Sequence, residues 1–487
     1  MRSSGHSCHA MPPADRIWSS RRGRRATRWL CGAIWSAIAL TGFGPVTVAS
    51  AQAVDPGVRG GDPGAGGPIS LITADETQFF SAGFTNFQVQ ELIANGLGPT
   101  FNLDSCAGCH AQPSVGGSSP SVNPQVAVAT AFGANNIVPS FVRSDGPVVE
   151  ARFKLTRSGK PDNGVHGLFV ISGRVDSSGS AAKCSAVQEN FDQQFADGNI
   201  SLRTPTPLFG LGLVQAITDK TLNDNLSGLG TSIGGVSVAA LKIRYGIGGS
   251  FNTNPNTGTI TKFGWKAQNA SLLLFAGEAY NVEMGITNEL FPGTRTPNPS
   301  CVFDVTPEDT TLVDGFGTLP APQTVSDLER FTFFMTFLAP PVPSTTTPGG
   351  AASIGNGRTQ FDTIGCGLCH SPSITTDPAS AFQATAGVAA NLFSDLALHH
   401  MGPGLADGIS QGLAAGDQFR TALLWGLGQR LFFLHDGRTN DLVAAIEDHA
   451  SSASSAYPAS EANAVVQNFN ALSQSNQQDL LNFLRSL

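Results

Sequence analysis

Cys106-Ala107-Gly108-Cys109-His110 recurs later in the chain as Cys366-Gly367-Leu368-Cys369-His370. The pattern Cys-x-x-Cys-His is the attachment signal for a c-type haem. Two thiols at this spacing can bond the two vinyl groups of one porphyrin edge, and the adjoining imidazole reaches the iron as its fifth ligand. A thioredoxin-type thiol pair and half of a zinc site are the alternatives, but both runs carry the histidine. The sequence therefore predicts two covalently bound haem c groups.

The N-terminus has the pattern of an export signal. A basic stretch that contains Arg21, Arg22 and Arg28 precedes an apolar run from Leu30 to Phe43, which is short for a membrane span. Small residues around position 51 offer cleavage sites. We therefore expect residues 1–51 to be a signal peptide, residues 52–70 to be a flexible mature N-terminus, and the protein to be periplasmic without a stable membrane span. A lasting N-terminal anchor is the alternative.

Charge limits the partners of the chain. The net charge is −8, and residues 1–51 hold seven arginines and one acid, so the remainder carries 21 basic and 35 acidic side chains. A chain with a net charge of −14 is a poor nucleic-acid binder. We expect no nucleic acid and, as electron donor or acceptor, a small redox protein such as a cytochrome c or a cupredoxin.

Two cysteines are left over once the others are assigned. Cys8 and Cys31 lie in the expected signal peptide, and four others belong to the haem motifs. Cys184 and Cys301 remain, in a compartment that permits disulfides. We expect them to form a disulfide.

Helical patterns flank both motifs and predict a mainly α fold. Gly357 to Gly365 fits a short helix that leads into the second motif, and an apolar stripe over 479–487 fits a closing helix. The first half closes similarly over 326–338, with Ser326 as N-cap, before Ala339-Pro340-Pro341 ends the helix. We predict tandem cytochrome c-like haem domains at 71–341 and 353–487, joined by a linker at 342–352.

An internal repeat and a length difference complete this plan. Phe263-Gly264-Trp265 and Phe433-Leu434-His435 are each followed by a leucine at the same spacing, which supports duplication of one haem-binding unit. The first half is longer because of a Gly- and Ser-rich region at about 113–262. Alternating runs at 150–155 and 168–175 indicate β-hairpins there. We expect an insertion rich in strands and loops.

The chain resembles the bacterial di-haem cytochrome c peroxidases and, more closely, the related di-haem oxidoreductases. Five runs outside the haem motifs carry the resemblance: Phe263-Gly264-Trp265-Lys266-Ala267, Asn281-Val282-Glu283-Met284-Gly285, the stretch from Ser394 to Gly408, Phe419-Arg420-Thr421, and Leu434-His435-Asp436-Gly437-Arg438. In those peroxidases the N-terminal haem reacts with H2O2 and the C-terminal haem passes electrons.

The resemblance implies roles for three side chains. Glu283 falls on the distal carboxylate, which moves a proton between the two peroxide oxygens as their bond breaks. Trp265 falls on the tryptophan that relays electrons between the haems. His435 falls on a histidine that we expect to support a haem propionate rather than to bind iron. The distal glutamine of the peroxidases is not reproduced, since Phe275 lies near its position.

The sixth iron ligands are less defined. The peroxidases place a Met where this chain has His449, and bis-imidazole ligation lowers a haem potential relative to His/Met. His449 is our expected ligand of the second haem, with Met401 and His399 as rivals. In the first half His166 is either a labile distal ligand or an ordinary loop histidine. The family's calcium ion between the domains is also implied, although the proline before its His-Asp-Gly run is missing here.

Three functions fit these features. The leading one is a peroxidase-type oxidoreductase, which either removes H2O2 or uses it on another substrate, as in the similar di-haem enzyme that matures the quinone of methylamine dehydrogenase. The alternatives are a di-haem electron carrier with both irons closed, and an oxygenase similar to the di-haem enzymes that cleave polyisoprene. Thiol oxidoreductase chemistry is excluded because thioether sulfurs cannot exchange disulfides.

Overall fold

The computed structural model describes residues 52–295, 298–311 and 321–487. The expected signal peptide, residues 1–51, lies outside them. Within these ranges no helix is both long and apolar enough to cross a membrane.

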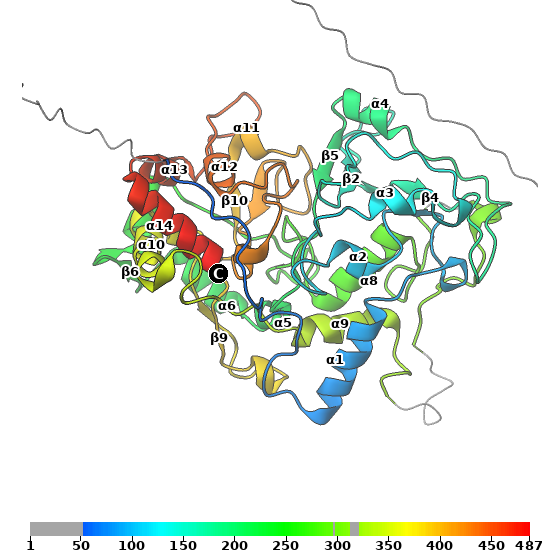
Figure 1. Ribbon diagram of the computed structural model, residues 1–487, viewed down its shortest axis with the longest axis horizontal. Coiled ribbons are helices and arrows are strands. Elements are labelled where there is room, and N and C mark those ends of the chain that lie inside the picture. The colour runs from blue at the N-terminus through cyan, green and yellow to red at the C-terminus, as the bar shows by residue number, and fades with distance from the viewer. Residues whose placement is uncertain (1–51, 296–297, 312–320) are drawn as a thin grey trace, which may run out of the picture. The chain divides into compact units, whose positions relative to one another are not determined.

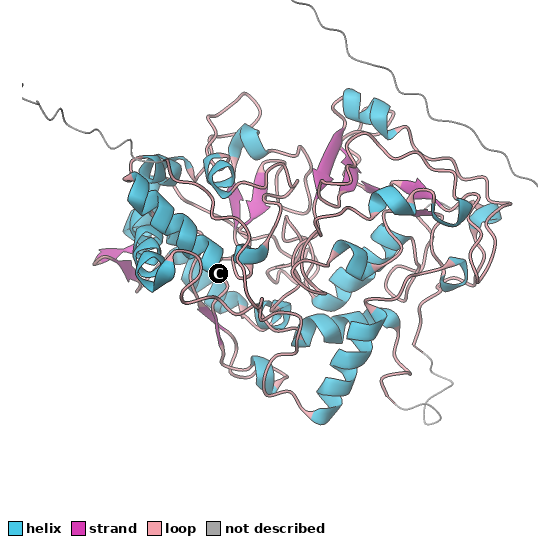
Figure 2. Ribbon diagram, viewed as in Figure 1, coloured by secondary structure: helices cyan, strands magenta, loops and turns pink. Residues whose placement is uncertain are grey.

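Helices are the main regular elements of the described chain, as Figure 2 shows. The first half contains α1 (Ala74–Asn86), α2 (Cys106–Cys109), α3 (Gln125–Val128), α4 (Phe191–Ala196), α5 (Leu211–Gln215), α6 (Asp219–Ser227), α7 (Val238–Tyr245), α8 (Leu272–Met284) and α9 (Asp327–Phe337). The second half contains α10 (Gly350–Ile364), α11 (Gly402–Leu405), α12 (Leu442–Glu447), α13 (Asn463–Asn470) and α14 (Gln474–Ser486). The prediction of a mainly helical chain is confirmed.

The strands are short and pair in small antiparallel sheets. Their bounds are β1 (Thr100–Phe101), β2 (Glu150–Phe153), β3 (Val165–His166), β4 (Phe169–Val170), β5 (Ile200–Arg203), β6 (Ser232–Ile233), β7 (Val236–Ser237), β8 (Ile374–Thr375), β9 (Ala389–Ala390), β10 (Leu398–His400) and β11 (Gln418–Arg420). β1 pairs with β4, β6 with β7, β8 with β9 and β10 with β11. In the three-stranded sheet β2 lies between β3 and β5, with Ala151 opposite His166 and Glu150 opposite Arg203.

In each half, the helix before the haem motif packs against the closing helix. α1 packs against α9 and α10 against α14, and both pairs can be followed in Figure 1. α9 begins after Ser326, which forms a capping box with Glu329, as the sequence predicts for its N-cap. The helices expected before the second motif and at the C-terminus are also present.

Phenylalanine rings pack against one another in the core of both halves. Phe87 and Phe334 pack together in the first half, with ring centroids 5.0 Å apart. Phe361 and Phe483 do so in the second, at 5.4 Å. All four side chains are buried. Aromatic rings of this size supply much of the apolar area that small helical units need to bury.

The region at 113–262 contains more helix than the sequence predicts. β2 and β4 lie within the two alternating runs, so strands there are confirmed. However, α3 to α7 also lie in this region. These helices are four to nine residues long, and so short a segment shows little apolar periodicity. The expectation of an insertion rich in strands and loops therefore missed these helices.

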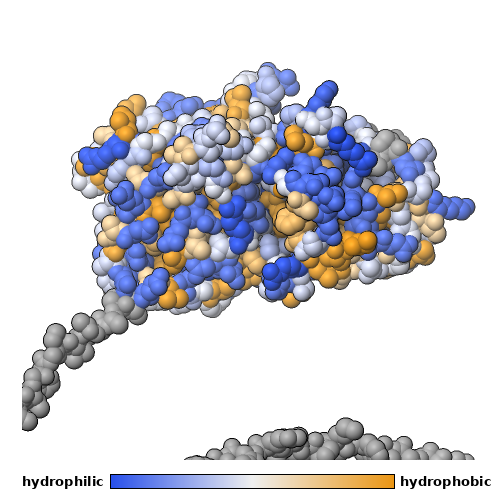
Figure 3. Space-filling model, turned by 90° about the horizontal axis from the view of Figure 1, so that it is seen from above, coloured by the Kyte–Doolittle hydropathy of each residue, from blue (hydrophilic) through white to orange (hydrophobic). Residues whose placement is uncertain are grey.

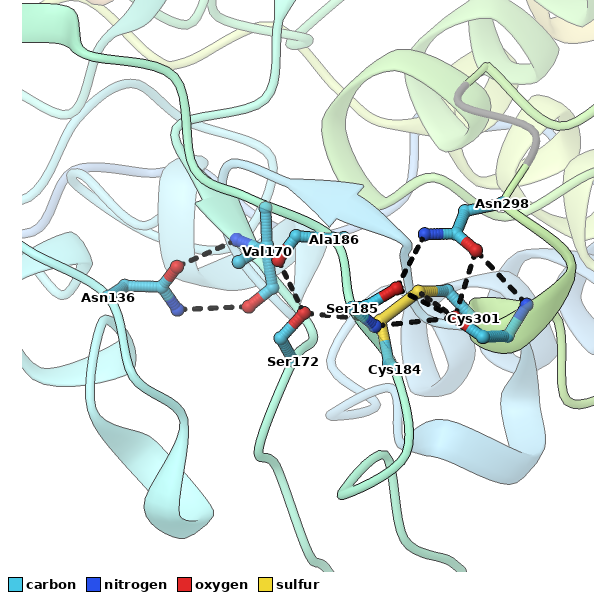
Figure 4. Close-up of a disulfide and its surroundings, with 9 residues drawn as sticks. Asn136, Val170, Ser172, Cys184, Ser185, Ala186, Asn298 and Cys301 are labelled. Carbon is cyan, nitrogen blue, oxygen red and sulfur yellow. Dashed lines mark hydrogen bonds between the residues drawn. A yellow bond between two sulfur atoms is a disulfide. The ribbon is translucent and has the colours of Figure 1, made fainter.

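Cys184 and Cys301 form the predicted disulfide, shown in Figure 4. Cys301 ends the short 3-10 helix η3 (Pro299–Cys301), whose N-cap Asn298 accepts a hydrogen bond from the Ser300 backbone. The disulfide therefore ties the inserted region to the segment between α8 and α9.

The two internal repeats adopt the same turn. The Phe263 backbone pairs with that of Asn269, and Phe433 pairs in the same way with Thr439. The next residue has a positive φ in both, +85° at Gly264 and +68° at Leu434. Trp265 and His435 thus occupy equivalent positions in two copies of one turn, as duplication predicts.

The segment 52–70, which the sequence predicts to be flexible, contacts the second half of the chain. Asp55 forms an ion pair with Arg485 at 2.6 Å and accepts a hydrogen bond from the Leu442 backbone. The Arg59 backbone also donates to Gly428. The segment therefore packs along α14 and the start of α12.

The outer surface is mixed in character. Figure 3 shows hydrophilic and hydrophobic residues interspersed over one face. The most exposed large apolar side chains include Val187 and Ile243, which lie far apart in the sequence. Single exposed apolar residues are normal on proteins and indicate no particular partner.

Candidate functional site

The first haem motif opens into a cavity. Cys106, Cys109 and His110 all line it. The His110 imidazole donates its Nδ1 proton to the Gly117 carbonyl, 3.0 Å away. This hydrogen bond leaves the lone pair of Nε2 free, which is the arrangement of an iron-binding histidine.

The second motif opens into a separate cavity, which is lined by Cys366, Cys369 and His370. His370 Nδ1 contacts the Phe393 carbonyl at 2.9 Å, so its Nε2 is free in the same way. Burial, and to a lesser degree the charge of nearby His449, lowers the pKa of His370 to about 4. The ring is therefore neutral at physiological pH, as a metal ligand must be.

Three further observations fit a porphyrin in each cavity. The four motif cysteines are not in disulfides. Burial raises the pKa of the Cys366 thiol to about 12, the opposite of a reactive thiolate, which argues against thioredoxin-type chemistry. Arg203 at the first cavity and Arg430 at the second each bury an Nε that lacks a hydrogen-bond partner among the described residues. Haem propionates are carboxylates that could satisfy such donors.

Glu283 lines the first cavity, as the sequence predicts for a distal carboxylate. It lies in the last turn of α8, and its Oε2 accepts a hydrogen bond from the Asn102 side chain at 2.7 Å. It also hydrogen-bonds to a second carboxylate, Glu150. Burial and the charge of Glu150 raise the pKa of Glu283 well above its ordinary value.

The partner carboxylate stays ionised. Burial alone would raise the pKa of Glu150, but the Arg152 guanidinium, 2.6 Å away, acts together with the hydrogen bond from Glu283 and the charge of Arg203 to lower it. Of the two carboxyl groups, Glu283 therefore keeps a proton more readily, and Glu150 carries the negative charge. The first cavity thus contains a carboxylic acid next to a carboxylate, an arrangement that can both deliver and accept a proton.

Sequence reasoning missed Glu150 and Arg152. Both belong to β2, where alternate residues point to one face, and both line the cavity. The alternation of apolar and polar residues at 150–155 is visible in the sequence, but the sequence does not show which face of this strand lies toward the haem motif. It also missed Gln268, whose side chain lines the same cavity.

The structure does not bring His166 to the first cavity. His166 pairs with Ala151 across the sheet, so its ring lies on the face opposite Glu150 and Arg152. There it stacks on Phe153 with ring centroids 3.7 Å apart, and its Nε2 contacts Asp162 at 3.3 Å. Strand register thus turns this side chain away from the haem motif.

Three candidate sixth ligands line the second cavity: His449, Met401 and His399. His449 follows α12, and its Nδ1 donates to the Ala445 carbonyl at 2.6 Å, which leaves Nε2 free. His399 differs because Asp395 contacts its Nε2 at 3.0 Å and Glu461 contacts its Nδ1 at 2.7 Å. With both nitrogens engaged, His399 has no free lone pair for iron. Met401 keeps its thioether available.

Trp265 lines both cavities. Its indole Nε1 donates to the Thr204 carbonyl at 2.9 Å, and the Thr204 backbone in turn donates to the His435 carbonyl at 2.8 Å. The Trp265 and His435 rings meet edge to face at 6.4 Å. His435 also stacks on Phe419 at 4.3 Å. These aromatic side chains connect the two cavities.

A buried charge cluster supports this connection. Asp407 pairs with Lys266 at 3.0 Å and with Arg203 at 2.6 Å, and all three side chains are almost inaccessible. The Lys266 ammonium lies 3.9 Å from the centre of the Phe419 ring. Sequence reasoning assigned this lysine no role, because the pairing depends on a tertiary contact between distant segments.

The expected calcium ion stays a prediction. The described residues contain no group of three or more His, Cys, Asp or Glu side chains arranged to hold a metal ion.

Comparison with known proteins identifies the family. The chain matches the family described as "Di-haem oxidoreductase, putative peroxidase" over residues 156–487, and it belongs to that family. The second haem motif lies inside the matched region and the first precedes it. The protein is therefore a haem-containing oxidoreductase, and the predicted resemblance is confirmed.

Solved structures give weaker likenesses. A MauG-like protein associated with microbial copper homeostasis is 16% identical over 58% of this chain and 90% of its own, with a TM-score of 0.29. Hydrazine synthase from Kuenenia stuttgartiensis is 17% identical over 34% of this chain and 58% of its own, with a TM-score of 0.22. We draw no function from these low scores. No curated protein sequence matches the chain.

Proposed function

We propose that the protein is a periplasmic di-haem c-type oxidoreductase of the peroxidase type. In this proposal H2O2 oxidises the haem of the first cavity, and electrons arrive through the haem of the second. One observation carries the proposal: the first cavity presents a protonated Glu283 beside an ionised Glu150, whereas the second presents the free imidazole nitrogen of His449.

The haem supplies the redox-active iron, and the protein supplies the proton transfers. Glu283 Oε2 accepts from Asn102, so its proton is carried by Oε1. We assign Glu283 as the acid that protonates the departing peroxide oxygen and Glu150 as the base that takes the proton of the incoming one. Arg152 holds Glu150 in its ionised form. Positioned acid–base groups of this kind contribute about 10²–10⁴-fold to a rate.

In the second cavity we assign His370 and His449 as the residues that would hold the haem iron. Two imidazole ligands would close that iron to peroxide and lower its reduction potential. Trp265 then serves as the relay between the haems, since it lines both cavities and contacts His435.

We further propose that the two halves are tandem cytochrome c-like domains at 71–341 and 353–487. The helix pairs α1–α9 and α10–α14 support this, as does the shared turn at Phe263 and Phe433. The four motif cysteines attach the haems covalently. Residues 1–51 direct export, and a small redox protein supplies electrons.

Stopped-flow absorbance of the haem-loaded protein mixed with H2O2 tests the function. We expect the optical change of the first haem to slow by about 10²–10⁴-fold in Glu283→Gln, because an amide cannot deliver the proton. Glu189→Gln, in the same half of the chain but outside the cavity lining, should react like the wild type. A wild type inert to H2O2, or an equally fast Glu283→Gln, would overturn the proposal.

A further inference from the structure

Tyr280 is a second polar residue of α8 that faces the first haem motif. It lines the cavity of Cys106 and His110, and it is only 3% exposed. Its hydroxyl donates a hydrogen bond to Glu91 Oε1 at 3.0 Å, and Glu91 is only 4% exposed. A buried phenol that donates to a buried carboxylate is costly, because an apolar ring would fill this space without placing a carboxylate in the core.

A continuous set of ring contacts connects Tyr280 with the expected iron ligand. The His110 imidazole lies 5.9 Å from the Phe87 ring, and Phe87 lies 6.0 Å from Phe331. Phe331 meets Tyr280 edge to face at 5.2 Å. Phe87, Phe331 and Tyr280 all line the cavity as well. The phenol is therefore near the haem site both directly and through packed aromatic rings.

Glu91 is suited to accept the phenolic proton. Burial and the nearby carboxylates of Asp327, Asp309 and Asp104 raise the pKa of Glu91 to about 7. A carboxylate with this pKa is a much stronger base than an ordinary glutamate and is still partly ionised at neutral pH. Two arginines near this cluster pair with aspartates rather than with Glu91. Arg330 pairs with Asp327 at 2.7 Å, and Arg174 pairs with Asp104 at 3.0 Å.

We propose that Tyr280 is a redox-active residue and that Glu91 is its proton acceptor. This rests on the proposed function, since peroxide must first oxidise the haem of the first cavity. One electron then passes from the Tyr280 ring to the oxidised haem, which is reduced by one equivalent. The phenolic O–H bond breaks, a new O–H bond forms at Glu91 Oε1, and a neutral tyrosyl radical remains. Return of one electron and the proton restores the phenol.

The pair gives the first haem a second route for an oxidising equivalent. Trp265 leads toward the second cavity, whereas Tyr280 lies in the aromatic core formed with Phe87 and Phe331. An equivalent on Tyr280 would thus remain within the first half. Proton transfer to the buried carboxylate leaves both the Tyr280 radical and Glu91 uncharged, which avoids leaving a charged radical in an apolar region.

Electron paramagnetic resonance of the full-length haem-loaded protein, frozen after H2O2 addition, tests the proposal. The chain has three tyrosines. Protein grown on ring-deuterated tyrosine should therefore show a narrowed radical signal if that signal is tyrosyl. We expect Tyr280→Phe to lose the signal, whereas Tyr245→Phe and Tyr457→Phe keep it. Optical spectra confirm that each variant is folded and carries both haems.

The variant Glu91→Gln tests the proton acceptor. It keeps the phenol but cannot take its proton, so we expect the radical yield to fall roughly tenfold or more. No tyrosyl signal in the wild type, or a signal that survives Tyr280→Phe, would overturn the inference. If H2O2 still changes the haem spectrum in that case, the proposed function is kept and only the role of Tyr280 is lost. If H2O2 leaves the spectrum unchanged, both fail.

Discussion

Three imidazoles in the two cavities share one hydrogen-bonding pattern. His110, His370 and His449 each donate Nδ1–H to a backbone carbonyl and keep Nε2 free. His399 and His166 instead direct ring nitrogens at carboxylates. A backbone acceptor fixes the tautomer without supplying a charge, so the pattern separates expected iron ligands from structural histidines.

Replacement of His449 tests this distinction. In His449→Ala the second haem should lose one strong-field ligand, and its low-spin ferric signal should convert to high spin. Met401→Leu is the matched control, because Met401 lines the same cavity but is not the assigned ligand. Low-temperature electron paramagnetic resonance measures both. Conversion in Met401→Leu, and not in His449→Ala, would reassign the ligand.

The Glu91 carboxyl makes stability depend on pH. Its pKa of about 7 lies above the ordinary 4.5, so the folded protein binds this proton more tightly than the unfolded chain. The contribution to stability is therefore complete below pH 4.5 and is lost as the pH rises through 7, by about 3 kcal/mol in total. Denaturant unfolding of the wild type and Glu91→Gln at pH 5 and pH 8 measures it. A similar loss in both proteins would contradict the assignment.

At the residue scale, the sequence predicted the side chains that belong to recognisable motifs. The sequence predicted both haem motifs and the distal position of Glu283, and in the structure all of these residues line the cavities. Glu150 could not be found because its role depends on its approach to Glu283, which is distant in the sequence. His166 illustrates the converse, since a lone histidine in an inserted strand carries no signal of the face it occupies.

Among the elements, the helices that pack on the haem motifs were predictable and the inserted region was less so. The stripe of α9 repeats at 3.6 residues over three turns and has a capping box at Ser326. Helices such as α3 and α5 last little more than one turn, so their formation depends on tertiary packing rather than on their own pattern.

The Cys184–Cys301 disulfide joins the inserted region to the segment between α8 and α9. Removal of this disulfide tests how much it stabilises the folded protein. The bridge closes a loop of 117 residues. A loop of this size restricts the unfolded chain enough to contribute about 3–5 kcal/mol. We expect Cys184→Ser with Cys301→Ser to lose that much stability in denaturant unfolding while keeping both haem spectra. An unchanged midpoint would show that the inserted region holds its place without the bridge.

For the whole molecule, the account depends on communication between the two cavities. Trp265 is the side chain that lines both, and it is oriented by the Thr204 carbonyl and packed near His435. Trp265→Phe keeps an aromatic ring but removes the indole N–H and its hydrogen bond. We expect electron transfer from the reduced second haem to the peroxide-oxidised first haem to slow by roughly tenfold or more in stopped-flow absorbance, while each haem keeps its own spectrum. An unchanged rate would require another route.

Asymmetry between the two irons is the central claim, and one measurement addresses it directly. The electron paramagnetic resonance spectrum of the resting ferric protein should contain one high-spin and one low-spin iron, and H2O2 should alter the high-spin signal. Two low-spin irons that ignore H2O2 would contradict the account and leave an electron carrier.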